Sequence, residues 1–309
     1  MQDDDEEHEK KVEGEREQVV GLGRREVTIG CRVELVGSEG TEGGGMRLPT
    51  GFEEEMGRSL AVLEGTDRLV VWLELAGEWP TNKQLERMLC RLYVLAEHHK
   101  ALRDQLLVQV DIHIHGFSNF HRPDSSLCHR PLMLPHHRFH TLALGGTFDH
   151  LHSGHKILLT MAAWIASHRL IVGITEELFT DDQLLINKQH ANRLQSLPER
   201  KQAVHDFLQR VGPLDLLLET PTLTDVYGPT AHDPHIDALL VSKETLPGAH
   251  AIDTIRSQNS LPPLHHYVVD VISNNLPSLP DNSLLKSLKI SSTNIRAWLD
   301  SRPSSSPST

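Results

Sequence analysis

Cysteines and long apolar runs are scarce in this sequence of 309 residues. The three cysteines, Cys31, Cys90 and Cys128, show no CxxC spacing, which argues against a disulfide framework and predicts a reducing compartment. No apolar stretch suits a membrane span or a signal peptide, and the acidic N-terminus lacks the character of a mitochondrial transit peptide. We therefore expect a cytoplasmic protein without membrane contact, with the nucleus as an alternative location.

Positive charge is also scarce, since the formal net charge is -12 at pH 7. Affinity for a nucleic-acid backbone depends on clustered Lys and Arg side chains, so a general nucleic-acid binder is disfavoured. Much of the negative charge lies in residues 1–20, which hold nine acidic and three basic side chains without hydrophobic periodicity. Such a segment is typical of a solvated tail, and any phosphate that the protein binds must be held locally.

The chain is long enough for two units, because one core usually serves about 100 to 200 residues. Residues 1–66 are acidic and glycine-rich, and we expect them to be mostly disordered. A small β-α-β region is predicted for residues 67–116, and the Pro, Ser and His content of residues 117–137 indicates a linker. Residues 138–300 form the predicted main domain, and residues 301–309 a disordered tail.

Apolar strands alternate with helices in the main domain. The pattern predicts strands at 140–146, 169–174, 214–219, 238–242 and 266–272, and helices at 153–167, 198–210, 250–257 and 292–300. Strands that are apolar throughout lie in a sheet covered on both faces, so the pattern predicts an α/β fold with a Rossmann-like, doubly wound parallel sheet. Ligands of such folds bind beyond the carboxyl ends of the strands.

The turn after the first of these strands, GGTFDHLHSGH at residues 145–155, has the composition of a phosphate site. Its glycines let a phosphate approach the backbone, and the following helix offers unpaired N–H groups and a positive dipole end. His152 and His155 are three residues apart, so both imidazoles point to one side of the helix, with Gly154 between them leaving room for a ligand. This arrangement suits nucleotidyl transfer, which needs alignment and charge stabilisation.

The histidine pair alone is weak support, because 21 histidines in this chain produce such a pair by chance about once or twice. The preceding apolar strand and the Gly-Gly-Thr sequence make chance a much poorer explanation. Other histidine groups, at His136, His137 and His140 or at His113 and His115, lack Cys or carboxylate partners at ligand spacing. We therefore expect no metal held by the protein itself.

The sequence GGTFDHLHSGHKILL resembles the first motif of the HxGH nucleotidyltransferase superfamily, and in detail that of eukaryotic phosphopantetheine adenylyltransferases. Four later segments resemble the same family in order and spacing: 184–200, 225–234, 239–252 and 289–296. The resemblance covers about residues 138–300. It implies transfer of the adenylyl group of ATP to 4'-phosphopantetheine in coenzyme A biosynthesis, with Mg²⁺ arriving on ATP and remaining mostly hydrated.

The last of these segments, KISSTNIR, places hydroxyl groups at the start of the final helix, where free N–H groups hold phosphates. Standing alone it is an ordinary helix cap, and the resemblance favours phosphate binding instead. The catalytic residues that the resemblance implies are His155, His152, Lys188 and Arg296. The implied ATP contacts are Gly145, Gly146, Thr147, Phe148, His155, Ser291, Ser292, Thr293 and Arg296, and the sheet-edge rule adds Ser242 and Glu244 near the adenine or ribose. The implied phosphopantetheine contacts are Thr147, Lys188 and Tyr227.

Asp149 has two interpretations, since it either steadies the turn or contributes to the chemistry, and the structural role is at least as well supported. Animal relatives of the family commonly carry a dephospho-coenzyme A kinase, whose GxxxxGK[ST] loop does not occur in this sequence. We therefore expect a monofunctional enzyme. The alternatives are another HxGH enzyme, either a cytidylyltransferase or a different adenylyltransferase, and a scaffold that docks other coenzyme A biosynthesis enzymes as partners.

Overall fold

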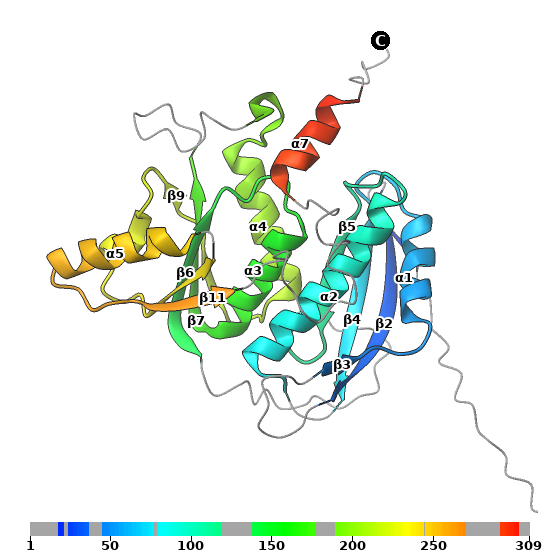
Figure 1. Ribbon diagram of the computed structural model, residues 1–309, viewed down its shortest axis with the longest axis horizontal. Coiled ribbons are helices and arrows are strands. Elements are labelled where there is room, and N and C mark those ends of the chain that lie inside the picture. The colour runs from blue at the N-terminus through cyan, green and yellow to red at the C-terminus, as the bar shows by residue number, and fades with distance from the viewer. Residues whose placement is uncertain are drawn as a thin grey trace, which may run out of the picture.

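The computed structural model describes residues 18–21, 24–36, 45–76, 79–118, 138–176, 189–243, 245–269 and 291–302. They form two β-sheets with helices between and around them (Figure 1). The expected α/β class, with a larger parallel sheet and a smaller N-terminal unit, is confirmed. Among the described helices, none is both long and apolar enough to cross a membrane.

The larger sheet contains six parallel strands. Their bounds are β6 (Phe139–Gly146), β7 (Ala166–Thr175), β8 (Leu217–Glu219), β9 (Thr222–Leu223), β10 (Ala238–Ser242) and β11 (His265–Val269). Five of them lie in the order β11-β10-β6-β7-β8, and β9 pairs with β7. The chain therefore proceeds outward from β6 to β7 and β8, and later returns to the other side of β6. The strand order reverses between β6 and β10, which is where folds of this kind open a ligand-binding crevice.

Both faces of this sheet are covered. Leu142 and Leu144 of β6 lie in the larger core, with α3 (Ser153–Ile165) and α4 (Leu197–Val211), whereas Ala143 lies in a smaller core with α5 (Leu246–Gln258). Helix α4 begins where the side chains of Ser196 and Glu199 each accept the other residue's backbone N–H, which satisfies two otherwise unpaired donors. Alternate residues of one strand thus enter different cores, as the unbroken apolar pattern predicts.

The smaller sheet consists of β1 (Gln18–Gly21), β2 (Arg24–Val36), β3 (Gly45–Arg47), β4 (Arg68–Ala76) and β5 (Gln109–Ile114). Strands β2, β4 and β5 are parallel, and α1 (Phe52–Ala61) and α2 (Asn82–Ala101) pack beside them (Figure 1).

Residues 1–66 are expected from the sequence to be mostly disordered, and β1, β2 and β3 together with α1 depart from that expectation. Phe52, Met56 and Leu60 recur at a spacing of four in α1 and are all buried, so three apolar residues suffice to attach an otherwise acidic and polar helix.

Asp111 of β5 connects the two units through a buried ion-pair network. Its carboxylate lies 2.9 Å from Lys156 Nζ of α3, 2.9 Å from Arg210 Nε of α4 and 3.1 Å from Arg68 Nε of β4. Burial raises the pKa of Asp111, but these three cations lower it by more, so the net pKa lies well below the usual value. Since both units supply partners to one fully buried carboxylate and α2 packs against α3, the two sheets share a single core.

Replacing Asp111 with Asn leaves buried cations without their counter-charge. We expect the free energy of unfolding to fall by about 3 to 5 kcal/mol, the usual cost of removing one partner from a buried ion pair. Urea unfolding at pH 7 measures this. The matched control is Glu34→Gln, which breaks an exposed pair with Arg47 at 3.9 Å and should cost less than about 1 kcal/mol. Equal losses in the two variants would contradict the buried network.

Candidate active site

The turn between β6 and α3 has an unusual backbone. Phe148 and His150 have φ angles of 50° and 43°, a left-handed conformation that non-glycine residues rarely adopt and that is concentrated at functional sites. The buried Phe148 ring lies against Gly146, where an added Cβ would come within 3.2 Å of the ring. His150 donates its backbone N–H to Gln195 Oε1 at 2.6 Å and its Nε2–H to the carbonyl of Arg193 at 2.7 Å. The backbone of the turn is therefore held by the Phe148 ring and by hydrogen bonds to Arg193 and Gln195, which precede α4.

Asp149 joins this turn to two distant segments, and its side chain is fully buried. Its Oδ1 accepts the backbone N–H of Gln195 at 3.0 Å, and its Oδ2 pairs with the guanidinium of Arg296. The backbone carbonyl of Asp149 accepts the hydroxyl proton of Ser292 at 2.8 Å. Ser292 is the first residue of α7 (Ser292–Asp300), so the first and last motifs of the domain meet at this carboxylate.

Arg296 is 1% exposed, and its hydrogen bonds run inward. Besides its pair with Asp149, its Nε donates to the carbonyl of Gln189 at 3.0 Å and a terminal nitrogen donates to Thr293 Oγ1 at 3.2 Å. The side chain of Ser291 caps the start of α7. The structure thus brings Ser291, Ser292 and Thr293 to the turn and places Arg296 beneath them.

His152 and His155 lie at the start of α3 with their rings stacked, 3.8 Å between centroids and 24° between planes. Burial lowers the pKa of His152 to about 3, and positive charge on Lys100, His150 and Lys156 acts in the same direction. His152 is therefore neutral at pH 7 and presents one N–H donor instead of a positive charge. Its buried Nδ1 has no hydrogen-bond partner among the described residues, as is common where a polar atom serves a ligand.

The residue that follows each histidine is bound by the N-terminal unit. Ser153 donates its hydroxyl to Glu97 Oε1 of α2 at 2.5 Å, and the same Oε1 lies 3.0 Å from Lys100 Nζ. Lys156 is 3% exposed and donates to Asp111 and, at 2.9 Å, to the carbonyl of Val110. Burial lowers the pKa of Lys156 to about 8, although Asp111 opposes the shift. Residues of the N-terminal unit therefore hold the first turn of α3 in place.

A cavity of about 790 Å³ adjoins the turn. His152 and Ser153 border it from α3, Ser291 and Asn294 border it from α7, and the N-terminal unit and α4 complete it. Its basic lining residues are Arg24, Arg68, Lys100, Lys156 and Arg210, and its acidic ones are Glu97, Glu199 and Asp206. The volume falls in the range of small-molecule sites, and most of the basic lining residues are already paired, Arg68, Lys156 and Arg210 with Asp111 and Lys100 with Glu97.

The remaining residues expected in the site lie on several elements. Gly145 and Gly146 end β6, and Ser242 ends the neighbouring strand β10, on the two sides of the reversal in strand order. Tyr227 lies before the 3-10 turn η2 (Gly228–Ala231) and packs against the smaller core. Lys188 and Glu244 fall outside the described residues.

Arg200 of α4 is a buried residue of this site that no catalytic motif indicates. Its Nη1 donates to the carbonyls of Thr147 at 2.9 Å and Thr175 at 2.8 Å, and its Nε donates to that of Gln195 at 2.9 Å. It therefore fixes the backbone of Thr147 relative to the end of β7. In the sequence, only its position at the end of the segment 184–200, which resembles the family, pointed to Arg200.

Comparisons with known proteins add the following findings. A family model described as Cytidylyltransferase-like matches residues 143–297. A phosphopantetheine adenylyltransferase from Saccharomyces cerevisiae is 41% identical over 167 residues, covering 54% of this chain and 51% of that protein. An uncharacterized protein from Schizosaccharomyces pombe is 42% identical over 159 residues, covering 51% and 47%.

A phosphopantetheine adenylyltransferase from Methanopyrus kandleri is 33% identical over 171 residues, covering 55% of this chain and 98% of that protein. The chain therefore spans about half the length of the first two relatives and nearly all of the third.

The low pKa of His152 predicts both a neutral ring and a pH-dependent stability. An unfolded histidine binds its proton near pH 6.5, whereas folded His152 does so only near pH 3. The unfolded state therefore binds more protons in that window, and stability is lost as the pH falls from about 6.5. NMR should show an imidazole that does not titrate between pH 5 and 8 and that disappears in His152→Ala, whose unfolding free energy depends less on pH. A midpoint near pH 6.5 for this ring would contradict its burial.

Proposed function

Because the chain belongs to the cytidylyltransferase-like family of nucleotidyltransferases, we propose that it transfers the adenylyl group of ATP to 4'-phosphopantetheine. The products are dephospho-coenzyme A and pyrophosphate. The observation that carries the proposal is the meeting of the α3 and α7 N-termini at Asp149, beside the point where the strand order reverses.

Two helix N-termini beside one turn suit a substrate with several phosphates. Each N-terminus offers unpaired N–H groups and a positive dipole end, so both favour anions. Nucleotidyl transfer by direct in-line attack needs no covalent enzyme intermediate, and the protein acts by aligning the reactants and stabilising charge on the phosphate oxygens. Neutral N–H donors and helix ends meet this need without a nucleophilic side chain.

The positions of the described residues support the following proposed roles. His152 and His155 donate to oxygens of the α-phosphate as the acceptor phosphate attacks it. Ser291, Ser292 and Thr293, together with the free N–H groups of α7, hold the leaving pyrophosphate. Arg296 is assigned the task of holding α7 in place, because its guanidinium is buried against Asp149.

Residues around the crevice complete the proposal. Gly145, Gly146, Thr147 and Phe148 are proposed to contact the nucleotide, and the sheet-edge rule favours Ser242 and Glu244 as contacts of its adenine or ribose. Thr147 and Tyr227 contact phosphopantetheine, and Lys188 bridges the acceptor phosphate and the α-phosphate. Mg²⁺ is proposed to enter as part of the ATP complex, largely hydrated, without protein ligands of its own.

The choice of acceptor rests on the relatives. Proteins from two organisms that match about half of this chain carry the name phosphopantetheine adenylyltransferase, at 41% and 33% identity. The two helix ends specify nucleotide chemistry more strongly than they specify the acceptor, and the segments 225–234 and 239–252 supply the likeness that narrows it.

His155→Ala removes one proposed donor to the transition state. We expect kcat for pyrophosphate release to fall about 10²- to 10³-fold, the usual effect of losing one such donor. The matched control is His205→Ala, on the exposed face of α4, which should retain the wild-type rate. Wild-type turnover by His155→Ala would overturn the assignment of the histidines.

Substrate preference tests the acceptor and the nucleotide separately. Pyrophosphate release should be fastest with ATP and 4'-phosphopantetheine, and at least about tenfold slower with CTP or with other phosphomonoesters as acceptors. Mass spectrometry should identify dephospho-coenzyme A as the product. Faster pyrophosphate release with CTP and a different phosphomonoester would contradict the proposed reaction and leave only the nucleotidyltransferase family assignment.

A further inference from the structure

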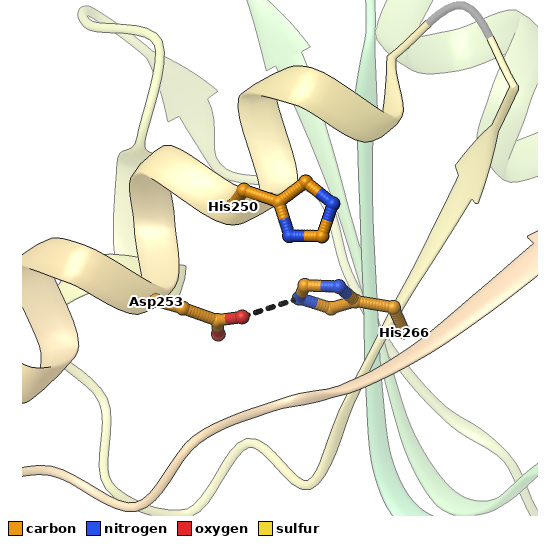
Figure 2. A group of neighbouring side chains, drawn as sticks. All are labelled: His250, Asp253 and His266. Carbon is orange, nitrogen blue, oxygen red and sulfur yellow. Dashed lines mark ion pairs between the residues drawn. The ribbon is translucent and has the colours of Figure 1, made fainter.

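Three potential metal ligands converge on the face of the main domain formed by α5 and β11, apart from the turn at Asp149. Figure 2 shows His250 and Asp253 projecting from α5 toward His266 of β11. His250 and Asp253 are three residues apart in a helix and therefore lie on one side of it. One ligand atom from each of the three residues lies within 4.8 Å of the others.

The distances are close to those of a metal site. His266 Nε2 lies 3.0 Å from Asp253 Oδ2, and two ligands bound to one Zn²⁺ at about 2.0 to 2.1 Å in tetrahedral geometry lie about 3.3 Å apart. The rings of His250 and His266 meet edge to face, 5.4 Å between centroids. His250 is exposed, so its ring reaches the other two ligands by a rotation that disturbs no core packing.

The carboxylate is already oriented by a second contact. Asp253 Oδ1 accepts the backbone N–H of Leu264 at 3.4 Å, which directs Oδ2 toward His266. Hydrogen bonds of this kind orient the ligands of protein metal sites and raise affinity. His266 is itself fixed by the pairing of β11 with β10, in which it lies opposite Leu239.

We propose that His250, Asp253 and His266 bind one divalent transition-metal ion, with Zn²⁺ as the most suitable. Two imidazoles and one carboxylate match Zn²⁺, Co²⁺ or Ni²⁺, whereas Mg²⁺ and Ca²⁺ require oxygen ligands. Because His250 is exposed and the other two ligands are half-buried, water completes the coordination. This site is independent of the Mg²⁺ that accompanies ATP.

The bound ion would link α5 to β11, since its ligands come from both elements. Only three residues of α5 are buried, Ala249, Ile252 and Arg256, so the helix is attached to the sheet by a small apolar contact. The helix begins just after Ser242, which ends β10 at the reversal in strand order. A ligand that binds the folded state alone stabilises it by mass action, so the metal stabilises the packing of α5 on the larger sheet.

The test uses the full untagged chain, stripped of metal, with Zn²⁺ as the probe. A competition titration against a chromophoric chelator should show one tight site, and His250→Ala, Asp253→Asn and His266→Ala should each weaken it at least about tenfold. Zn²⁺ at 100 times its Kd should raise Tm by about 5 °C in the wild type and not in these variants. His250→Ala alters an exposed helix position, so its fold is retained.

The matched control is His265→Ala, which removes the neighbouring histidine on β11. Successive strand residues point to opposite faces, and the His265 ring lies against Phe139 instead. This variant should bind Zn²⁺ and gain stability as the wild type does. Equal weakening by His265→Ala, or unchanged binding after His250→Ala and His266→Ala together, would show that the three residues form only an ion pair with a neighbouring ring.

Discussion

The buried residue Asp149 holds the turn at residues 145–155 and the N-terminus of α7 in one place, through its carboxylate and its backbone carbonyl. It lies in a turn with two left-handed residues and is bonded to the segment before α4 and to Arg296 of α7. A buried charge is tolerated only when it is paired and hydrogen-bonded, so Asp149 and Arg296 hold each other in place. The two helix N-termini that approach the turn are separated by most of the domain in sequence. Their common position therefore depends on this pair.

The N-terminal unit also restricts the position of the turn, through contacts with the start of α3. Ser153 and Lys156 follow the two histidines directly, and both are bonded to buried acidic residues of that unit. Burial lowers the pKa of His152, the neighbouring cations act in the same direction, and the ring is therefore neutral. His152 therefore presents an N–H donor of fixed orientation, which suits the proposed alignment of a phosphate. The N-terminal unit thus takes part in shaping the turn, in addition to packing against it.

Local patterns in the sequence predicted the turn at residues 145–155 and most of the main domain's helices and strands, but not β9 or the end of α3 at Ile165. Local patterns could not predict contacts between residues that lie far apart in the sequence. The buried position of Arg296, which the resemblance assigned to catalysis and ATP binding, depends on its pairing with Asp149. The cluster at His250 depends on His266, which lies 13 residues after Asp253 and on another element. The helix α1 was missed because its apolar residues, although spaced as in a helix, lie in a glycine-rich and charged stretch whose composition favours disorder.

A double-mutant cycle on Asp149 and Arg296 tests the dependence of the site on their pairing. Asp149→Asn and Arg296→Gln should each lower kcat/KM for pyrophosphate release by about 10²-fold, because each leaves one buried charge unpaired and displaces α7. The double variant removes both charges, so its loss should be no greater than that of either single variant, a strong coupling between the two sites. Losses that multiply in the double variant, or single variants with wild-type rates, would contradict the account.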